Sequence, residues 1–309
     1  MPELREVETI ARGLDKRVSG DVIESVWLGQ KKEPLKSTAS EIAAALEHSR
    51  IGAVRRMGKH IVFDLDHVGP GVERALLPAN GRGGKRRLKK SGTTVPTRYA
   101  EAGGSARSKI ITKTQWIVHL GMTGSLRVCE PQTEVAKHTH AIMKLASGRE
   151  LRFIDPRRFG RLSVTSEFEA SGVEPLEVDL DRFVALFRGR KTPIKSALLY
   201  QNLLRGVGNI YADESLFRAS IRPRRRASSI TRDQLGKLYA SVQEVLREAI
   251  SLGGSSISDY VDADGEEGFF QLQHRVYGRE GEACLVCKSP IKRVVIASRS
   301  SHYCPKCQK

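Results

Sequence analysis

The chain has 309 residues and carries 52 Lys and Arg against 35 Asp and Glu, a formal net charge of +17 at pH 7. This length allows two or three domains with a substantial core, and the charge favours a polyanionic partner, with nucleic acid as the first candidate. No apolar run approaches the roughly 18 residues of a membrane-spanning helix, and no signal peptide follows Met1, so we expect a cytoplasmic protein without a membrane partner.

The first half of the sequence predicts two helices and a domain rich in strands. A helix is expected over residues 6–17, where apolar residues recur at helical spacing and Glu6 and Glu8 lie in the first turn, which the helix dipole favours. A second, shorter helix is expected over residues 41–48, with Ser40 as its N-cap. Runs of β-branched and aromatic residues predict strands at residues 60–66, 114–120, 140–145 and 150–155.

Residues 78–113 fit neither a strand nor a helix. They contain ten Lys or Arg and one acid, Glu101, so their net charge of +9 is more than half of the excess charge of the chain. Gly, Ser and Thr fill the gaps and leave little to bury. Two interpretations stay open: a solvated, poorly ordered insertion between two strands, which we favour, or a loop that grasps DNA without sequence preference.

From about residue 179 the hydrophobic period becomes helical. Glycine-containing turns separate the helices that we expect at residues 182–189, 194–204, 210–219 and 231–254. The sequence therefore predicts an α+β protein of several domains. We expect a β domain at residues 1–165, a helical domain at 175–270, and a C-terminal segment at 275–309 that is too short for a core of its own.

Four of the five cysteines form two C-x-x-C pairs near the end of the chain. Sixteen residues separate the pairs, which are Cys284, Cys287, Cys304 and Cys307. This spacing is typical of a zinc site with four thiolates, and the intervening residues alternate like a hairpin that could bring the pairs together. Because four protein thiolates leave no open position on zinc, we expect one structural ion. The alternative, a redox dithiol, is disfavoured because no thioredoxin-like pattern accompanies the cysteines.

Taken with this ending, five segments resemble a known protein family. The opening PELREVET at residues 2–9 is followed by VRRMGKHIVFDL, HLGMTGSL, RFIDPRRFG and GVGNIYADESLF, which begin at Val54, His119, Arg152 and Gly206. The chain thus resembles the formamidopyrimidine-DNA glycosylases from end to end, apart from the basic insertion. The resemblance implies an N-terminal two-sheet β-sandwich with flanking helices, a helix-two-turn-helix domain and a zinc-finger hairpin. It also implies a monomer that binds double-stranded DNA between its two large domains.

The family's activity is the excision of oxidised purines, such as 8-oxoguanine and formamidopyrimidines, followed by cleavage of the strand. By resemblance, removal of Met1 would expose the secondary amine of Pro2, which attacks the sugar C1′. An α-amine has a pKa of about 7.7–8.0, so part of it is unprotonated at neutral pH. Attack expels the base and leaves a Schiff base, and successive β and δ eliminations then break the strand on both sides of the abasic site.

The resemblance assigns further catalytic roles. Glu3 corresponds to the general acid–base group that manages protons at the sugar, and Glu6 to a supporting carboxylate that positions the amine or a water. Glu6 could equally be a favourable charge in the first helical turn. Lys59 corresponds to the lysine that contacts the lesion and the adjacent phosphate, and Lys59 and Arg299 are the expected proton donors during elimination.

The remaining assigned residues bind DNA. Met122, Arg157 and Phe159 match the residues that fill the space left by an extruded nucleotide. The expected phosphate contacts are Lys195, Arg299 and Asn209, the last as the N-cap of a helix whose free amides bind an anion. His119 is a further expected DNA contact. Residues 255–270 correspond to a loop that folds over the extruded base. Arg5 replaces the proline usual in the opening motif, and the effect of that change is not evident from the sequence.

Two rival functions stay open. The endonuclease eight-like branch of the same superfamily prefers oxidised pyrimidines, but HLGMTG and the PELxEVE opening favour the purine branch. A catalytically silent protein that senses damaged DNA is the other, and the presence of Pro2, Glu3 and Lys59 in matching context argues against it. The expected location is the bacterial cytoplasm, in association with the nucleoid.

Overall fold

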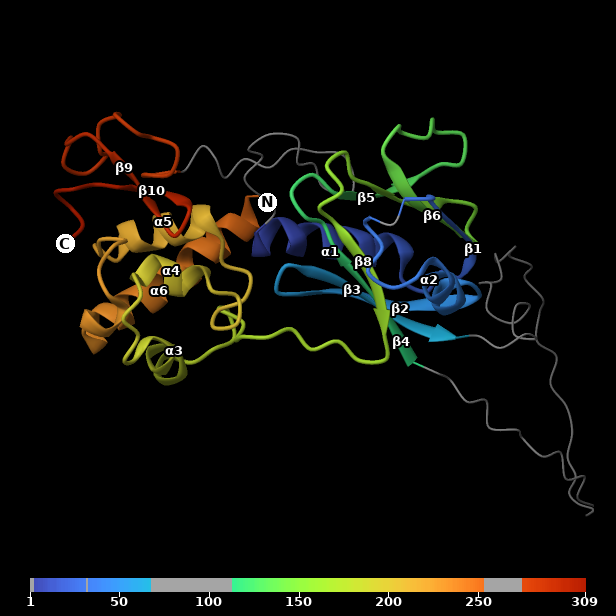
Figure 1. Ribbon diagram of the computed structural model, residues 1–309, viewed down its shortest axis with the longest axis horizontal. Helices are drawn as coiled ribbons and strands as arrows, with labels where there is room; N and C mark the ends of the chain where they lie inside the picture. The colour runs from blue at the N-terminus through green and yellow to red at the C-terminus, as the bar shows by residue number, and fades with distance from the viewer. Residues whose placement is uncertain (1–2, 32, 68–112, 253–273) are drawn as a thin grey trace, which may run out of the picture.

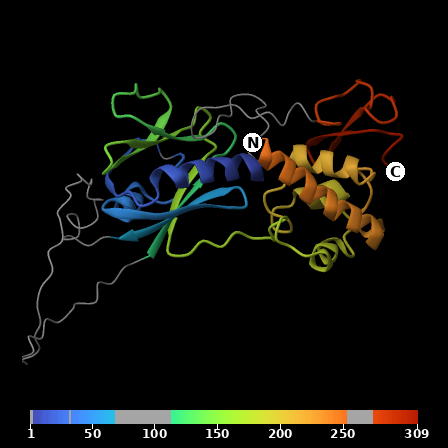
Figure 2. The same ribbon diagram turned by 180° about the vertical axis from the view of Figure 1, so that it is seen from behind.

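The computed structural model describes residues 3–31, 33–67, 113–252 and 274–309. Pro2, nearly all of the basic insertion and the expected loop over the extruded base lie outside these residues. Figures 1 and 2 show a β lobe beside a helical lobe, with the C-terminal hairpin on the helical lobe and the first helix starting at the boundary between them.

The β lobe is a sandwich of two antiparallel four-stranded sheets, which confirms the expected two-sheet architecture. Buried residues from both sheets form one core, including Phe63 and Trp116 from one and Met143 and Phe153 from the other. The first sheet has the order β1-β6-β7-β5, spanning Ile23–Leu28, Thr139–Leu145, Glu150–Ile154 and Ser125–Cys129. The second has the order β2-β3-β4-β8, spanning Ser49–Met57, His60–His67, Lys113–His119 and Arg161–Thr165.

The first helix, α1, spans Leu4–Val18 and so begins two residues earlier than expected. Glu3 is its N-cap, and the Glu3 backbone N–H donates to the Glu6 carboxylate at 2.8 Å in a capping box. The predicted apolar face is confirmed, since its members are buried against the sandwich core: Val7, Ile10, Leu14 and Val18. One face of α1 therefore anchors the N-terminal segment to the β lobe.

The second helix, α2, spans Ala39–Leu46, so its predicted cap and end were wrong. Thr38 is the N-cap and shares a capping box with Glu41, whose carboxylate accepts from the Thr38 N–H at 2.8 Å. Ser40 therefore lies inside the first turn. The helix ends before His48, which adopts a left-handed backbone with φ 59°.

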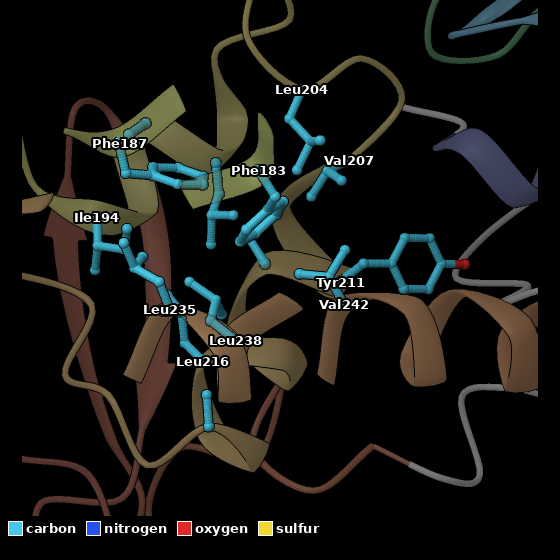
Figure 3. Packing of buried hydrophobic residues seen from close by; sticks show 14 of the residues in the cluster. Phe183, Phe187, Ile194, Leu204, Val207, Tyr211, Leu216, Leu235, Leu238 and Val242 are labelled. Atoms are coloured by element: carbon cyan, nitrogen blue, oxygen red, sulfur yellow. The ribbon is translucent and has the colours of Figure 1, made fainter. Parts of the chain in front are cut away.

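The helical lobe contains α3 (Leu180–Phe187), α4 (Ile194–Leu199), α5 (Asn209–Arg218) and α6 (Arg232–Ser251). Figure 3 shows part of its core, with Tyr211 at the edge and the Tyr211 hydroxyl pointing out of the cluster. The helix expected over residues 194–204 was too long. The Gln201 side chain bridges the end of α4 to the next segment, donating to the Leu199 and Val207 carbonyls at 2.9 Å each. None of the described helices is long and apolar enough to cross a membrane.

The C-terminal segment is the expected hairpin, with β9 (Lys292–Ile296) paired to β10 (Arg299–Tyr303). Two buried acids at the middle of α5 join it to the helical lobe. The Asp213 carboxylate accepts the His302 N–H at 2.9 Å, and the Glu214 carboxylate accepts three successive amides at residues 275–277. The hairpin is thus held in a defined position on α5.

Candidate active site and DNA-binding surface

The centre of the candidate site lies where α1 of the β lobe meets α5 of the helical lobe. The Glu3 side chain is only 4 % exposed, and its carboxylate accepts the Ile210 N–H at 3.0 Å and the Tyr211 N–H at 3.3 Å. The Leu4 N–H donates to the Gly206 carbonyl at 2.9 Å. The residue next to the expected nucleophile is therefore fixed by both lobes, although Pro2 itself lies outside the described residues.

Glycine is required where the chain passes beneath Glu3. A Cβ at Gly208 would collide with the Glu3 carboxyl group, and Gly206, with φ +89°, packs against Leu4 so closely that a Cβ would lie 2.6 Å from Leu4 Cδ1. L-residues rarely adopt that backbone angle. Gly208 thus leaves the space into which the Glu3 carboxyl group fits, and Gly206 leaves the space for the Leu4 side chain beside it.

Burial dominates the electrostatics of Glu3. It raises the pKa of Glu3 to about 7, against opposing effects from Lys59 and the two α5 amides, while Glu6 adds to the rise. Burial also lowers the pKa of Lys59, which Glu3 and Glu6 oppose and Arg299 reinforces. Glu3, Glu6, Lys59 and Arg299 therefore interact as one cluster, assembled from both ends of the sequence. A carboxyl group with a pKa near neutrality is suited to donating and accepting protons at physiological pH.

Tyr211 links the two acids. Its hydroxyl donates to the Glu6 carboxylate at 2.7 Å, its own N–H donates to Glu3, and the other Glu6 oxygen accepts the Glu3 N–H. The ring is completely buried in the core of the helical lobe. Sequence reasoning missed this residue because an aromatic ring in a helical run indicates packing rather than a role in a site.

Lys59 lies in the β2–β3 turn, which a second missed residue holds in place. Glu174 accepts the Gly58 N–H at 2.9 Å, two hydrogen bonds from the Arg56 guanidinium at 2.8 and 2.9 Å, and one from Arg205 at 2.9 Å. Burial alone would raise the pKa of Glu174, but these donors lower it below its usual value. No local pattern marks Glu174, because Arg56 is 118 residues away in sequence.

The three expected void-filling residues lie on two adjoining loops. Met122 is 41 % exposed and Phe159 is 50 % exposed, and the Arg157 guanidinium lies 4.8 Å from the centre of the Phe159 ring. Gly121, with φ +68°, approaches the Phe159 backbone so closely that a Cβ there would lie 2.7 Å from the Phe159 carbonyl oxygen. The structure therefore brings Met122, Arg157 and Phe159 together in one exposed cluster, the wedge.

Asp155 organises both loops and was also missed. Its buried carboxylate accepts the Thr123 hydroxyl at 2.6 Å, the Arg157 N–H at 3.2 Å and the Gly160 N–H at 2.7 Å. The position was detectable in principle, since an Asp between a strand and a Pro commonly orders a turn through its side chain.

His119 ends β4 beside this wedge. Its Nδ1 accepts the Gly121 N–H at 3.1 Å, which leaves Nε2 as the hydrogen-bond donor of the neutral ring. Burial lowers the pKa of His119 to about 4, and His60, Lys59 and Arg161 add to that effect. His119 is therefore a neutral donor at pH 7.

Two predictions about phosphate contacts need correction. Asn209 is the first residue of α5 and Gly208 is the N-cap, and the amides expected to bind an anion are taken by Glu3. Asn209 Nδ2 instead lies 3.4 Å from the Ser300 hydroxyl in the hairpin. The helix terminus binds a carboxylate of the protein itself, which the sequence separation concealed.

Lys195 does not reach the surface. It is completely buried, with Nζ 2.7 Å from Asp213 and donating to the Ser300 carbonyl at 2.6 Å, so the predicted phosphate contact was wrong. A buried ammonium requires such partners, and here they join α4, α5 and the hairpin. Arg299, beside Ser300, is exposed at the start of β10. Lys195 therefore holds the hairpin that presents Arg299.

The four C-terminal cysteines fit a zinc ion. Their Sγ atoms all lie within 4.8 Å of one another, and two of the pairs are 3.4 and 3.9 Å apart. Tetrahedral zinc with Zn–S bonds of about 2.3 Å places sulfurs about 3.8 Å apart. Cys284, Cys287, Cys304 and Cys307 would supply all four ligands, and zinc bound there would cross-link the segment without activating water.

Comparison with known proteins agrees with this geometry. A model of the formamidopyrimidine-DNA glycosylase N-terminal domain matches residues 1–162, the H2TH domain of the same enzymes matches residues 172–261, and a zinc finger found in FPG and IleRS matches residues 281–309. A formamidopyrimidine-DNA glycosylase from Solibacter usitatus is 40 % identical over the whole of both chains.

The chain belongs to the formamidopyrimidine-DNA glycosylase family. It is also similar to the crystal structure of the enzyme from Thermus thermophilus, with a TM-score of 0.76, 36 % identity and coverage of 99 % and 98 % of the two chains. The Lactococcus lactis enzyme in a complex with DNA that contains N7-benzyl-Fapy-dG gives a TM-score of 0.78 at 28 % identity over the whole of both chains. These matches confirm the expected fold class and the zinc-finger module.

Proposed function

We propose that the protein removes oxidised purines from duplex DNA by covalent catalysis at Pro2 and then cuts the strand at the abasic site. The glycosylase class follows from family membership, and structures of relatives have been solved in complexes with DNA that contains Fapy-dG, carbocyclic 8-oxo-G or an abasic site. The covalent route and the roles of individual residues are our inference from the site.

The proposed reaction begins at the N-terminal amine of Pro2. The unprotonated Pro2 nitrogen attacks the deoxyribose C1′, the C1′–N bond to the damaged base breaks, and the base leaves with a proton. The Pro2 nitrogen then loses its own proton, and its lone pair opens the sugar ring by breaking the C1′–O4′ bond as O4′ takes a proton, which leaves an iminium. The resulting iminium acidifies the C2′ hydrogen, so β elimination expels the 3′ phosphate and δ elimination expels the 5′ phosphate. Glu3 transfers protons at the sugar, and Lys59 and Arg299 donate protons during elimination.

The observation that carries this proposal is the environment of Glu3. Glu3 lies next to the N-terminal proline and is buried at the lobe boundary, where burial raises its pKa to about 7 despite the hydrogen bonds from two amides. Burial that raises the pKa of a carboxyl group above its usual range costs folding free energy and is typical of catalytic acids and bases, so this environment supports a catalytic role.

The DNA-binding roles follow from the exposed residues. Met122 and Phe159 enter the stack and Arg157 hydrogen-bonds the base opposite the extruded nucleotide, which offsets part of the few kcal/mol that extrusion costs. Arg299 and the neutral His119 donate hydrogen bonds to phosphates. Lys195 acts indirectly by holding the hairpin. We also propose the domain limits 1–165, 175–270 and 275–309, and a location in the bacterial cytoplasm at the nucleoid.

Parallel excision assays test the proposal. Duplexes with 8-oxoguanine, thymine glycol or no lesion are incubated with the zinc-loaded protein, and base release and strand cleavage are measured separately. We expect release of 8-oxoguanine, two cuts that leave phosphates on both ends, and loss of release in Glu3→Gln with duplex affinity retained. Preference for thymine glycol would favour the endonuclease eight-like function, and binding without release of either base would favour a silent sensor.

A further inference from the structure

A basic hollow lies beside the loop of residues 155–160, in a part of the β lobe that the catalytic steps do not use. Its volume is about 400 Å³, and its lining includes Trp27, Lys31, Lys137, His138 and Arg158. None of its described lining residues is acidic. A second hollow of about 350 Å³ shares Arg158 and adds Lys36, Phe159 and Arg161 together with one acid, Glu33, so the two hollows adjoin at Arg158.

Trp27 is an unusual residue for this surface. It lies on β1, the edge strand of its sheet, and is 52 % exposed, whereas Trp116, the other tryptophan of the chain, is completely buried. An exposed indole costs hydrophobic free energy, and at nucleic-acid interfaces aromatic rings pack against bases and sugars. Its position among cations suggests an anionic partner with apolar parts.

The cations of the hollow are available for such a partner. Within the described residues, none of Lys31, Lys137 and Arg158 forms an ion pair, although the chain pairs many of its other arginines. Three unpaired positive charges around one hollow repel each other and are stabilised by phosphates, whose binding releases counterions.

Arg158 connects the hollow to the wedge. Its backbone is left-handed, with φ 59°, between Arg157 and Phe159, a conformation that is uncommon for a non-glycine residue. Asp155 maintains it, since the Asp155 carbonyl accepts the Arg158 N–H at 3.3 Å and its carboxylate accepts the N–H groups of Arg157 and Gly160. Arg157 stacks over Phe159 while Arg158 lines the hollow, so one short loop serves two neighbouring contacts.

We infer that this hollow binds the backbone of the strand opposite the lesion. Arg157 and Phe159 enter the duplex beside the base that has lost its partner, so the next phosphates of that same strand pass Arg158. Lys31, Lys137 and Arg158 bind these phosphates, and the Trp27 indole packs against an adjacent sugar. The inference rests on the proposed insertion of Arg157 and Phe159 into the duplex and not on the covalent chemistry at Pro2.

Tryptophan fluorescence tests the inference directly. The zinc-loaded protein is titrated with a duplex that carries a non-cleavable tetrahydrofuran abasic analogue, and acrylamide quenching is measured at saturation. We expect quenching to fall because the strand covers Trp27, and we expect Trp27→Phe, which retains only buried Trp116, to show no change. Unchanged quenching at saturation in the wild type would overturn the inference, whether or not the protein cleaves DNA.

The strand and the cations have separate tests. We next use a duplex whose opposite strand lacks the nucleotides around the unpaired base. Acrylamide should then quench Trp27 as strongly as it does in the free protein. If Trp27 stays protected from acrylamide, this strand does not occupy the hollow. Salt dependence tests the cations. Lys137→Ala should reduce the slope of log duplex affinity against log salt concentration by about the amount expected for one phosphate contact. Lys237→Ala, on the exposed face of α6, should leave the slope unchanged. Equal slopes for both variants would remove Lys137 from the interface.

Discussion

Single residues in this site carry large free-energy terms because they are buried where two lobes meet. Glu3 illustrates this most clearly: it is removed from water and bound by two amides, yet burial still raises the pKa of Glu3 to about 7. Its usual pKa is 4.5, so at pH values between 4.5 and 7 the folded protein keeps a Glu3 proton that the unfolded chain releases.

Glu3→Gln should therefore change how stability depends on pH. Between pH 4.5 and 7 the unfolded wild-type chain releases the Glu3 proton first, so folding stability falls by about 3 kcal/mol as pH rises. The glutamine of the variant has no proton to release. Urea unfolding at pH 5 and pH 8 should thus show the variant gaining about 3 kcal/mol relative to the wild type at the higher pH, and a constant difference would contradict the assigned pKa.

Tyr211→Phe tests the link between the two acids. Loss of the 2.7 Å hydrogen bond to Glu6 should leave that buried carboxylate partly unsatisfied and misplace the N-terminal segment. Hydrogen bonds to charged groups contribute about 1.5–3 kcal/mol, so single-turnover base release should slow by about tenfold or more, with affinity for a non-cleavable duplex unchanged. Tyr239→Phe, which also loses one hydroxyl hydrogen bond, to Val178, is the control. Equal rates for the two variants would exclude a positioning role.

The sequence predicted residue identities better than residue roles. Glu3, Lys59 and Arg299 do meet in one cluster, as the family motifs implied. Lys195 and the α5 amides were assigned to phosphates because the local sequence pattern gives no sign that other groups bind them. In the folded protein, Asp213 binds Lys195 and Glu3 binds the amides, so neither is free to bind a phosphate. Tyr211, Asp155 and Glu174 act through contacts that no local pattern contains.

At the scale of elements, the start of α5 positions the site. Its N-terminal amides and dipole stabilise the Glu3 carboxylate, in the way a helix terminus binds an external anion. Gly208, the N-cap, leaves room for the carboxyl group itself.

Gly208→Ala should therefore remove Glu3 from its place. The added methyl group collides with the Glu3 carboxyl group, so we expect base release to fall as far as in Glu3→Gln and stability to fall by about 1–3 kcal/mol. Gly236→Ala, inside α6 with nothing within 4 Å of the new Cβ, should instead stabilise by about 0.5–1 kcal/mol and leave activity unchanged. Base release and urea unfolding measure both, and normal release by Gly208→Ala would contradict the proposed position of Glu3.

Helices and strands were predictable where the hydrophobic periodicity was strong. Their ends were less predictable, because individual side-chain contacts decide them. The apolar face of α1 and the strands near residues 60, 114, 140 and 150 were confirmed. The cap of α2 was wrong because Thr38 and Ser40 both suit an N-cap and only the Thr38–Glu41 capping box distinguishes them. The early end of α4 depends on Gln201, whose partners lie beyond the helix.

At the scale of the molecule, the site exists only when three parts are assembled. Glu3 belongs to the β lobe, its amide donors to the helical lobe, and Arg299 to the hairpin that Lys195, Asp213 and Glu214 hold on α5. The order of these parts was predictable from the motifs, but their contacts were not, because they join residues far apart in sequence.

Loss of zinc should therefore impair DNA binding. Cys307→Ser removes one ligand, so bound zinc should fall well below one per chain, the hairpin should lose its fixed position, and duplex affinity should fall by about tenfold or more as Arg299 is displaced. Cys129→Ser, outside the cluster, should retain zinc and affinity. Metal content and duplex binding measure both, and full affinity in zinc-depleted Cys307→Ser would contradict the role of the hairpin.

Borohydride trapping tests the central claim most directly. The protein is incubated with an 8-oxoguanine duplex and sodium borohydride, which reduces an iminium to a stable bond, and the cross-linked peptide is identified by mass spectrometry. We predict a covalent adduct on the nitrogen of Pro2, in a chain that lacks Met1. Release of 8-oxoguanine without an adduct, or an adduct on Lys59 in place of Pro2, would contradict it.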